Sequence, residues 1–261
     1  MIPDFELITH RFPERKDITI IPISDVHLGA RECMEQEFMA FISAIEKQPD
    51  TYVLLLGDLL NNCTRNSVSD IFEETMRPSE ARKMMTEILK PIRHKILAAV
   101  GGNHERRNKD TDDFPVYDIM CRLEIENRYR ENIAFVKLQF GEHDNTSGVR
   151  RPTYVMALTH GNGGGALTSG AVLRGERTAY ALEGVDMLLF GHTHKPWTSV
   201  PARIVVDAKN NRVSVKPFRV LNVTSWLEYS TYAMRKMLLP TSHNLQTIRL
   251  AGDHKEIAVT M

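Results

Sequence analysis

The stretch ITIIPISDVH, residues 18–27, decides the fold of this chain. An apolar, β-branched run ends in Ser24-Asp25-Val26-His27, so a buried strand delivers polar side chains at its C-terminal end. Asp25 and His27 stand two positions apart, so they point to the same side of the strand. In open α/β sheets the carboxyl edge of the strands is where ligands bind.

The same arrangement recurs at the ends of four further apolar runs. Residues 52–56 lead into Gly57-Asp58, 95–100 into Gly101-Gly102-Asn103-His104-Glu105, 153–159 into His160-Gly161, and 186–190 into Gly191-His192-Thr193-His194. Five strands that end in this way would bring their loops to one crevice.

The rest of the chain alternates helices and strands before it changes to strands alone. Helical spacing and capping residues predict helices over 34–48, 67–76, 79–90, 116–126 and 169–182, and apolar patterning adds a strand over 133–140. Hairpins are predicted around 208–211 and 251–253. Because no linker separates the halves, we expect a single α/β domain over residues 1–261, with two sheets and helices outside.

The composition excludes several classes of protein. The 261 residues carry 33 Lys+Arg and 33 Asp+Glu, and 42% are apolar, which excludes disorder and argues against a strongly basic nucleic-acid coat. No apolar run is long enough to cross a bilayer, and residues 1–6 lack the features of a signal peptide. Cys33, Cys63 and Cys121 form no CxxC pair, so we expect a reducing, cytoplasmic setting and no membrane partner.

The polar residues at the strand ends have the chemistry of metal ligands. The candidates are Asp25, His27, Asp58, Asn103, His160, His192 and His194. Carboxylate, imidazole and amide oxygen suit manganese, iron, zinc, cobalt or nickel, whereas calcium prefers oxygen ligands alone. Seven ligands are too many for one tetrahedral site but fit two metals that share Asp58. A metal pair about 3.5–4 Å apart suits in-line attack on phosphorus.

These blocks together resemble the calcineurin-like metallophosphoesterase superfamily, in which they stand in the same order; here they span residues 25–194. The chain is most similar to its small bacterial or phage-borne members. The resemblance implies a four-layer αββα sandwich with two mixed sheets. It also implies a metal-dependent phosphoric ester hydrolase, which cleaves phosphodiesters or phosphomonoesters by attack of a metal-bridging hydroxide.

The resemblance also assigns roles to residues. Asp25, His27 and His194 would bind one metal, Asn103, His160 and His192 the other, and Asp58 would bridge them. The cofactors would be two divalent ions, most consistent with manganese, with iron, zinc, nickel or cobalt also open. His104 would act with Asp58 in catalysis, by protonating the leaving oxygen or steadying the transition state.

One position departs from the protein-phosphatase branch of the superfamily, where Gly-Asp-x-x-Asp supplies a second Asp to orient the catalytic His. Here that position is Asn61. An amide raises the pKa of an imidazole less than a carboxylate does. The pKa of His104 beside Asn61 is therefore expected to be lower than that of the catalytic His in the protein-phosphatase branch. Glu105 is expected to hold a neighbouring ligand through hydrogen bonds.

The substrate is the least constrained part of the hypothesis. Arg106 and Arg107 follow the His104 loop and could bind phosphate, and the backbone of Gly163 and Gly164 could approach a phosphate oxygen. Arg174 and Arg177, on the predicted helix after this glycine loop, are weaker candidates for phosphate binding. The substrate would be a small-molecule or nucleic-acid phosphoester. A nuclease acting on DNA or RNA ends or single strands, an inactive binding scaffold, and a homodimer through the C-terminal β region remain open.

Overall fold

The computed structural model describes residues 4–14, 16–64, 67, 71–141, 152–163, 167–229, 233–234, 237 and 239–261. Its helices are α1 (Glu35–Glu46), α2 (Pro78–Leu89), α3 (Pro115–Arg122) and α4 (Thr168–Tyr180), with 3-10 turns η1 (Ile71–Glu73), η2 (Lys90–Lys95), η3 (Glu105–Thr111) and η4 (Glu126–Arg128). None of the helices in this part of the chain has the length and apolar character needed to cross a bilayer.

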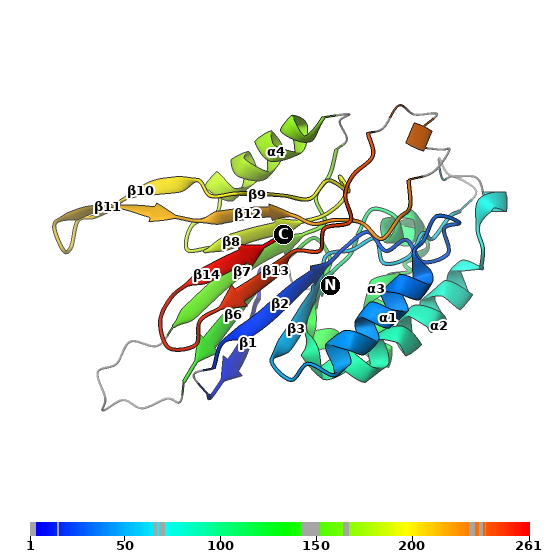
Figure 1. The fold of residues 1–261 in the computed structure, drawn as a ribbon, viewed down its shortest axis with the longest axis horizontal. Coiled ribbons are helices and arrows are strands. Elements are labelled where there is room, and N and C mark those ends of the chain that lie inside the picture. Colours follow the sequence, from blue (N-terminus) through cyan, green and yellow to red (C-terminus); the bar gives the residue numbers. More distant parts are fainter. Residues whose placement is uncertain are drawn as a thin grey trace.

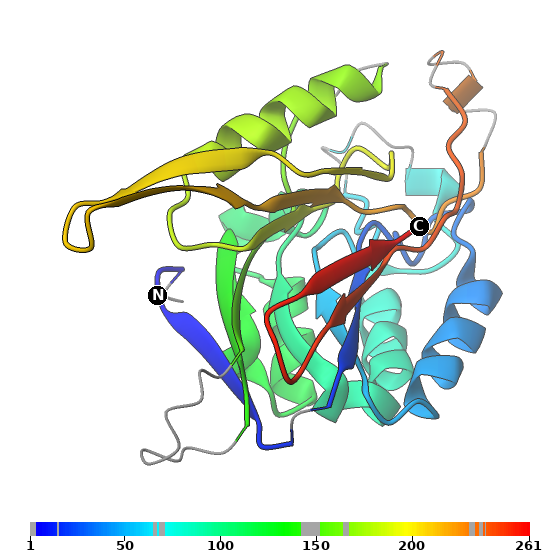
Figure 2. The same cartoon turned by 60° about the vertical axis from the view of Figure 1, so that its left-hand side comes forward.

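The strands of the described residues form two six-stranded sheets and one two-stranded ribbon. The first sheet contains β14 (Ile257–Thr260), β13 (Thr247–Leu250), β2 (Ile18–Ile23), β3 (Thr51–Leu55), β4 (Ile96–Val100) and β5 (Tyr129–Arg130), in that order. The second contains β1 (Leu7–Phe12), β6 (Ile133–Phe140), β7 (Thr153–Thr159), β8 (Met187–Phe190), β12 (Arg219–Asn222) and β9 (Trp197–Ser199). The ribbon pairs β10 (Ala202–Asp207) with β11 (Arg212–Pro217) and extends beyond the sheets (Figures 1 and 2).

Both sheets are mixed. In the first, β2, β3, β4 and β5 run parallel, whereas β13 and β14 add antiparallel pairs at one side. In the second, β7, β8 and β12 run parallel, and β6 and β9 pair antiparallel with β7 and β12. A parallel set places its carboxyl ends at one edge, so each sheet gathers its strand-end loops on one side.

The chain forms four layers: α1–α3, the first sheet, the second sheet and α4 (Figure 1). Three apolar clusters lie between these layers. Side chains alternate along a strand, and β3 shows the consequence: Val53 and Leu55 pack beneath α1–α3, whereas Leu54 packs between the two sheets. A third cluster, around Ala171 and Leu188, lies beneath α4. Each fully buried aliphatic side chain contributes about 1.5–3 kcal/mol. The predicted αββα sandwich is confirmed.

Most predicted elements are present, and the helix predicted over 67–76 is wrong. Of its described residues, only Ile71–Glu73 form a 3-10 turn. The reason is that Thr75 donates from both N and Oγ1 to Gly29 O, at 2.9 and 3.1 Å, so its backbone binds a neighbouring loop. Strands β1, β5, β9 and β12 were missed. β1 is an edge strand in which Ile8 is the one buried residue, so it lacks the apolar run that marks the other strands.

Lys95 ties the end of α1 to β4, and its loss is expected to destabilise the fold. Its Nζ is buried and donates to Ile45 O at 2.8 Å, Glu46 O at 3.2 Å and Gln48 O. These carbonyls lie at and just after the C-terminal end of α1. Lys95→Met should lower the free energy of unfolding by about 2 kcal/mol, because the charge-assisted hydrogen bonds of Nζ to the carbonyls are lost.

Urea denaturation monitored by circular dichroism measures this change. Lys90→Met is the matched control, because the side chain of Lys90 is 65% exposed. If both variants lost the same stability, the contacts of Lys95 would not be responsible for the effect.

Candidate metal centre

The loops that follow the strands adopt a backbone conformation that is rare for residues with a side chain. φ is positive at five of the seven candidate ligands: Asp25 (53°), His27 (51°), Asp58 (49°), His192 (68°) and His194 (56°). Each such residue costs on the order of 1 kcal/mol or more and persists only where its surroundings hold it. Strain of this kind concentrates at functional sites.

Three ligand candidates converge on one point at the end of β2. His194 Nε2 lies 3.1 Å from Asp25 Oδ1 and 3.3 Å from His27 Nε2. His27 Nε2 is 3.7 Å from the same carboxylate oxygen. Asp25 is fully buried, and its Oδ1 has no hydrogen-bond partner of good geometry. A buried carboxylate oxygen left in this state is costly unless a cation binds it.

A second group converges beside it, at the ends of β4, β7 and β8. Asn103 Oδ1 lies 2.9 Å from His160 Nε2 and 2.7 Å from His192 Nδ1. His160 Nε2 and His192 Nδ1 are 3.2 Å apart, and Asp58 Oδ2 is 3.2 Å from His160 Nε2. Asp58 Oδ2 also lies 3.8 Å from His27 Nε2, so this carboxylate stands between the two groups.

The donor atoms fit divalent cations of the first transition row. His160 Nδ1 donates to Leu56 O at 2.8 Å, so Nε2 is the ring nitrogen that faces Asp58 and Asn103 and would bind a cation there. The sets Asp25, His27, His194 and Asp58, His160, His192 each place ligand atoms within 4.8 Å of one another. Nitrogen and oxygen donors in such sets suit manganese, iron, zinc, cobalt or nickel.

The charges inside this cluster compensate one another. Burial alone would raise the pKa of Asp58, but the neighbouring His160 and His27 outweigh it and hold that pKa well below its usual range. Burial would likewise lower the pKa of His160, yet the Asp58 carboxylate raises that pKa to about 9. In the metal-free protein, a proton on His160 thus balances the Asp58 charge. A divalent cation would take over this balance and displace the proton.

The sequence profile described as calcineurin-like phosphoesterase matches residues 18–196, which is more than half of the chain and includes every candidate ligand. This chain belongs to the calcineurin-like phosphoesterase family. The family consists of phosphoesterases that typically bind divalent metals, and the two Asp/His groups are the candidate metal-binding residues of this member.

Comparison with solved structures gives distant similarities. A conserved uncharacterized protein of Streptococcus pneumoniae TIGR4, described as a predicted phosphoesterase, is 14% identical with a TM-score of 0.36, over 94% of this chain and 98% of the other. The NAD nucleotidase of Haemophilus influenzae is 8% identical with a TM-score of 0.38, over 94% of this chain and 49% of the other, so the chain spans about half of that protein. No curated protein matches the chain.

Glu105 fixes the two loops that carry Asp58 and Asn103. Its Oε2 accepts from Asp58 N at 3.0 Å and Gly102 N at 2.8 Å, and its Oε1 accepts from Leu60 N at 3.0 Å. Burial, together with the charge of Asp58, raises the pKa of Glu105 to about 7. Gly102 is required here because a Cβ would collide with Asp58 Oδ1. Glu105 is therefore a positioning residue for the loop around Asp58.

His104 is held by backbone and by Arg107, not by the side chain of Asn61. Its Nδ1 donates to Asn61 O at 2.8 Å, while the Asn61 side chain donates to Glu74 Oε1. Arg107 donates from Nη2 to His104 Nε2 at 3.0 Å and from Nη1 to Asn61 O at 2.9 Å. Burial and the proximity of His27 lower the pKa of His104 to about 3. His104 is thus neutral, with its Nε2 lone pair engaged by Arg107.

The other residues predicted to contact substrate are Arg106, Gly163 and Gly164. Arg106 donates from Nη2 to Glu131 O at 2.9 Å and to Gly101 O at 3.4 Å, so this nitrogen holds the loop backbone. Gly163 has a φ of 77°, and a Cβ there would collide with the guanidinium of Arg174, so Gly163 serves to seat that side chain. Gly164 lies outside the described residues.

Two residues that hold the loops of the site, Asn222 and Asn62, were not predicted from the sequence. Asn222 donates to Thr193 Oγ1 and Lys195 O, both at 2.6 Å, and so holds the loop that carries His192 and His194. Asn222 is the last residue of β12, a strand too short to recognise by its pattern. Asn62 donates to His104 O at 2.8 Å. The available signal for Asn222 was its position after the apolar Val220-Leu221 pair.

Proposed function

We propose that this phosphoesterase hydrolyses phosphodiester or phosphomonoester bonds with two divalent cations. The observation that carries the proposal is the convergence of seven donor side chains on two adjacent points that share Asp58. Asp25, His27 and His194 would hold one cation, and Asn103, His160 and His192 the other. Two cations held by these residues would lower the pKa of a bound water and neutralise charge on phosphoryl oxygens.

His104 and Arg107 form the part of the proposal that moves protons and binds the phosphoryl group. His104 Nε2 is 3.8 Å from Asp58 Oδ2, so it is close enough to the cluster to act on a group bound there. Arg107 holds His104 in its Nδ1–H form, because its guanidinium N–H already donates to Nε2. When a phosphoryl oxygen attracts Arg107, the Nε2 lone pair of His104 is released. It can then take the proton that the attacking water loses and pass it to the leaving oxygen.

Metal replacement tests the cofactor part of the proposal. Protein treated with a chelator and dialysed is expected to lose activity toward bis-p-nitrophenyl phosphate by about a hundredfold or more, because the charge of the cations is then absent. Manganese should restore activity and calcium should not, since four of the seven ligands are imidazoles. Unchanged activity after verified metal removal would contradict the proposal.

An activity panel with manganese tests the reaction class. The panel is p-nitrophenyl phosphate, bis-p-nitrophenyl phosphate, cyclic nucleotides, and single- and double-stranded DNA. We expect hydrolysis of at least one aryl ester, which separates monoesterase from diesterase, and the nucleic acids report a nuclease. Inactivity on every member with every borderline metal would favour a binding scaffold instead.

A further inference from the structure

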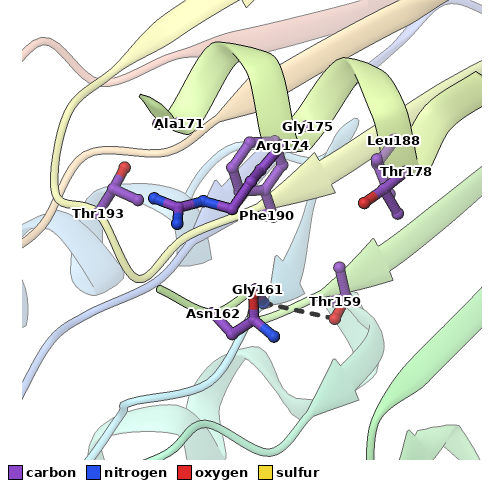
Figure 3. Close-up of a pocket in the computed structure, with 10 residues that line it drawn as sticks. All are labelled: Thr159, Gly161, Asn162, Ala171, Arg174, Gly175, Thr178, Leu188, Phe190 and Thr193. Carbon is purple, nitrogen blue, oxygen red and sulfur yellow. Dashed lines mark hydrogen bonds between the residues drawn. The ribbon is translucent and has the colours of Figure 1, made fainter. Parts of the chain in front are cut away.

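A small cavity lies between α4 and the outer face of the second sheet (Figure 3). Its volume is about 50 Å³. A buried water requires about 10–15 Å³ of such space, so the cavity accommodates a group of a few heavy atoms. A phosphate or carboxylate has this size, whereas a nucleobase does not.

The cavity borders the candidate metal centre. Thr159 and Gly161 line it and flank His160, and Thr193 lines it between His192 and His194. Because consecutive Cα atoms are about 3.8 Å apart, one wall begins a single residue away from these three candidate ligands. A substrate group that sits in the cavity would therefore remain close to a phosphoryl group at the metal centre.

Arg174 gives the cavity its charge. It stands on α4, and its side chain runs back toward the start of the helix, as helical side chains do. The guanidinium lies against Gly163, where a Cβ would collide with it, and Nη2 is 3.7 Å from where a Cβ on Gly170 would be. Figure 3 shows the guanidinium on the side of Thr193 and Asn162. No Asp or Glu is among the described residues that line the cavity.

Two hydroxyls in the wall are prepared to donate hydrogen bonds. Thr193 Oγ1 already accepts from Asn222 Nδ2 at 2.6 Å, and Thr159 Oγ1 accepts from Gly161 N at 3.4 Å (Figure 3). A hydroxyl that already accepts keeps its own proton for another partner. A guanidinium and two hydroxyl donors that line one cavity are complementary to an anion.

We infer that this cavity binds a second, non-scissile anionic group of the substrate, with Arg174 as its counter-charge. The inference rests on the proposed function and narrows its substrate class to phosphoesters that carry a second phosphate or carboxylate within short reach of the scissile bond. Arg174 acts on substrate binding and takes no part in bond cleavage.

Binding of inorganic phosphate to the metal-free protein tests the cavity without catalysis. Isothermal titration should show saturable binding by the wild type, weakened by about tenfold or more in Arg174→Ala. The phosphate affinity of Arg174→Lys should lie between those of the wild type and Arg174→Ala, because lysine keeps the positive charge but lacks the paired N–H donors of a guanidinium. Arg177→Ala is the matched control, since Arg177 is exposed on the same helix and is not among the lining residues. Absent binding by the wild type, or equal binding by Arg174→Ala, would overturn the inference.

A matched pair of dinucleotides tests the substrate class with manganese present. Dithymidylate with a 5′-phosphate should have a KM about tenfold below that of the same dinucleotide without it, at similar kcat. Arg174→Ala should remove the difference in KM, and Arg177→Ala should keep it. Equal KM values in the wild type would overturn the inference, while hydrolysis of bis-p-nitrophenyl phosphate in the same preparation reports separately on the proposed function. If neither dinucleotide is cleaved, the phosphate titration decides.

Discussion

Asp58→Asn is expected to reduce turnover by about three orders of magnitude or more while the protein stays folded. The loss follows from the position of Asp58 between the two ligand groups, 3.2 Å from His160 Nε2 and 3.8 Å from His27 Nε2. An amide has one neutral oxygen and cannot share charge between two cations. Metal content, measured by mass spectrometry of dialysed protein, should fall together with kcat.

The fold should tolerate this change because each contact of Asp58 has a replacement in Asn. Oδ1 accepts from His104 N at 2.8 Å, and an amide oxygen can accept the same bond. The amide Nδ2 can donate to His160 Nε2, whose ring already donates to Leu56 O from Nδ1. Asp50→Asn, at an exposed position, is the control. An Asp58→Asn protein that keeps both metals and full activity would remove Asp58 from its bridging role.

The convergence of the candidate ligands could be predicted from the sequence because its signal is local. Each block of candidate ligands begins shortly after a run of buried residues, such as Leu54, Leu55 and Leu56 before Asp58. A strand buried on both faces is apolar at every position, so its end is marked by the first polar residue. The parallel neighbours then place those ends together, which is why five separate blocks could be assigned to one site.

The supporting contacts were not accessible, because they depend on pairings between distant residues. Asn61 shows this: its position in the motif predicts a side chain beside His104, but that side chain binds Glu74 while the backbone carbonyl supports the imidazole. Arg174 is similar, since its position on α4 says nothing of the seat provided by Gly163. Tertiary contacts, and not the local sequence pattern, determine which partners side chains such as Asn61 and Arg174 bind.

His104→Asn is expected to lower kcat by about two to three orders of magnitude while the metal content stays unchanged. The structure gives the reason for separating the two effects. The Nε2 lone pair of His104 already accepts from Arg107 at 3.0 Å, so Arg107 occupies the position from which this atom would bind a cation. The variant therefore removes a proton carrier and leaves the cation-binding groups intact.

The competing interpretation is that His104 is itself a ligand, because His27, Asp58 and His104 also place donor atoms within 4.8 Å of one another. Metal analysis of the dialysed variant decides between the two roles, with exposed His94→Asn as the control. Retained metal with slow turnover assigns His104 to proton transfer, and lost metal assigns it to coordination. The leaving group adds a second criterion: a proton carrier matters least for p-nitrophenolate, which needs no proton to depart, and most for an alkoxide. A defect in His104→Asn that grows from aryl to alkyl esters would thus identify the general acid, since loss of a metal ligand should slow both kinds of ester.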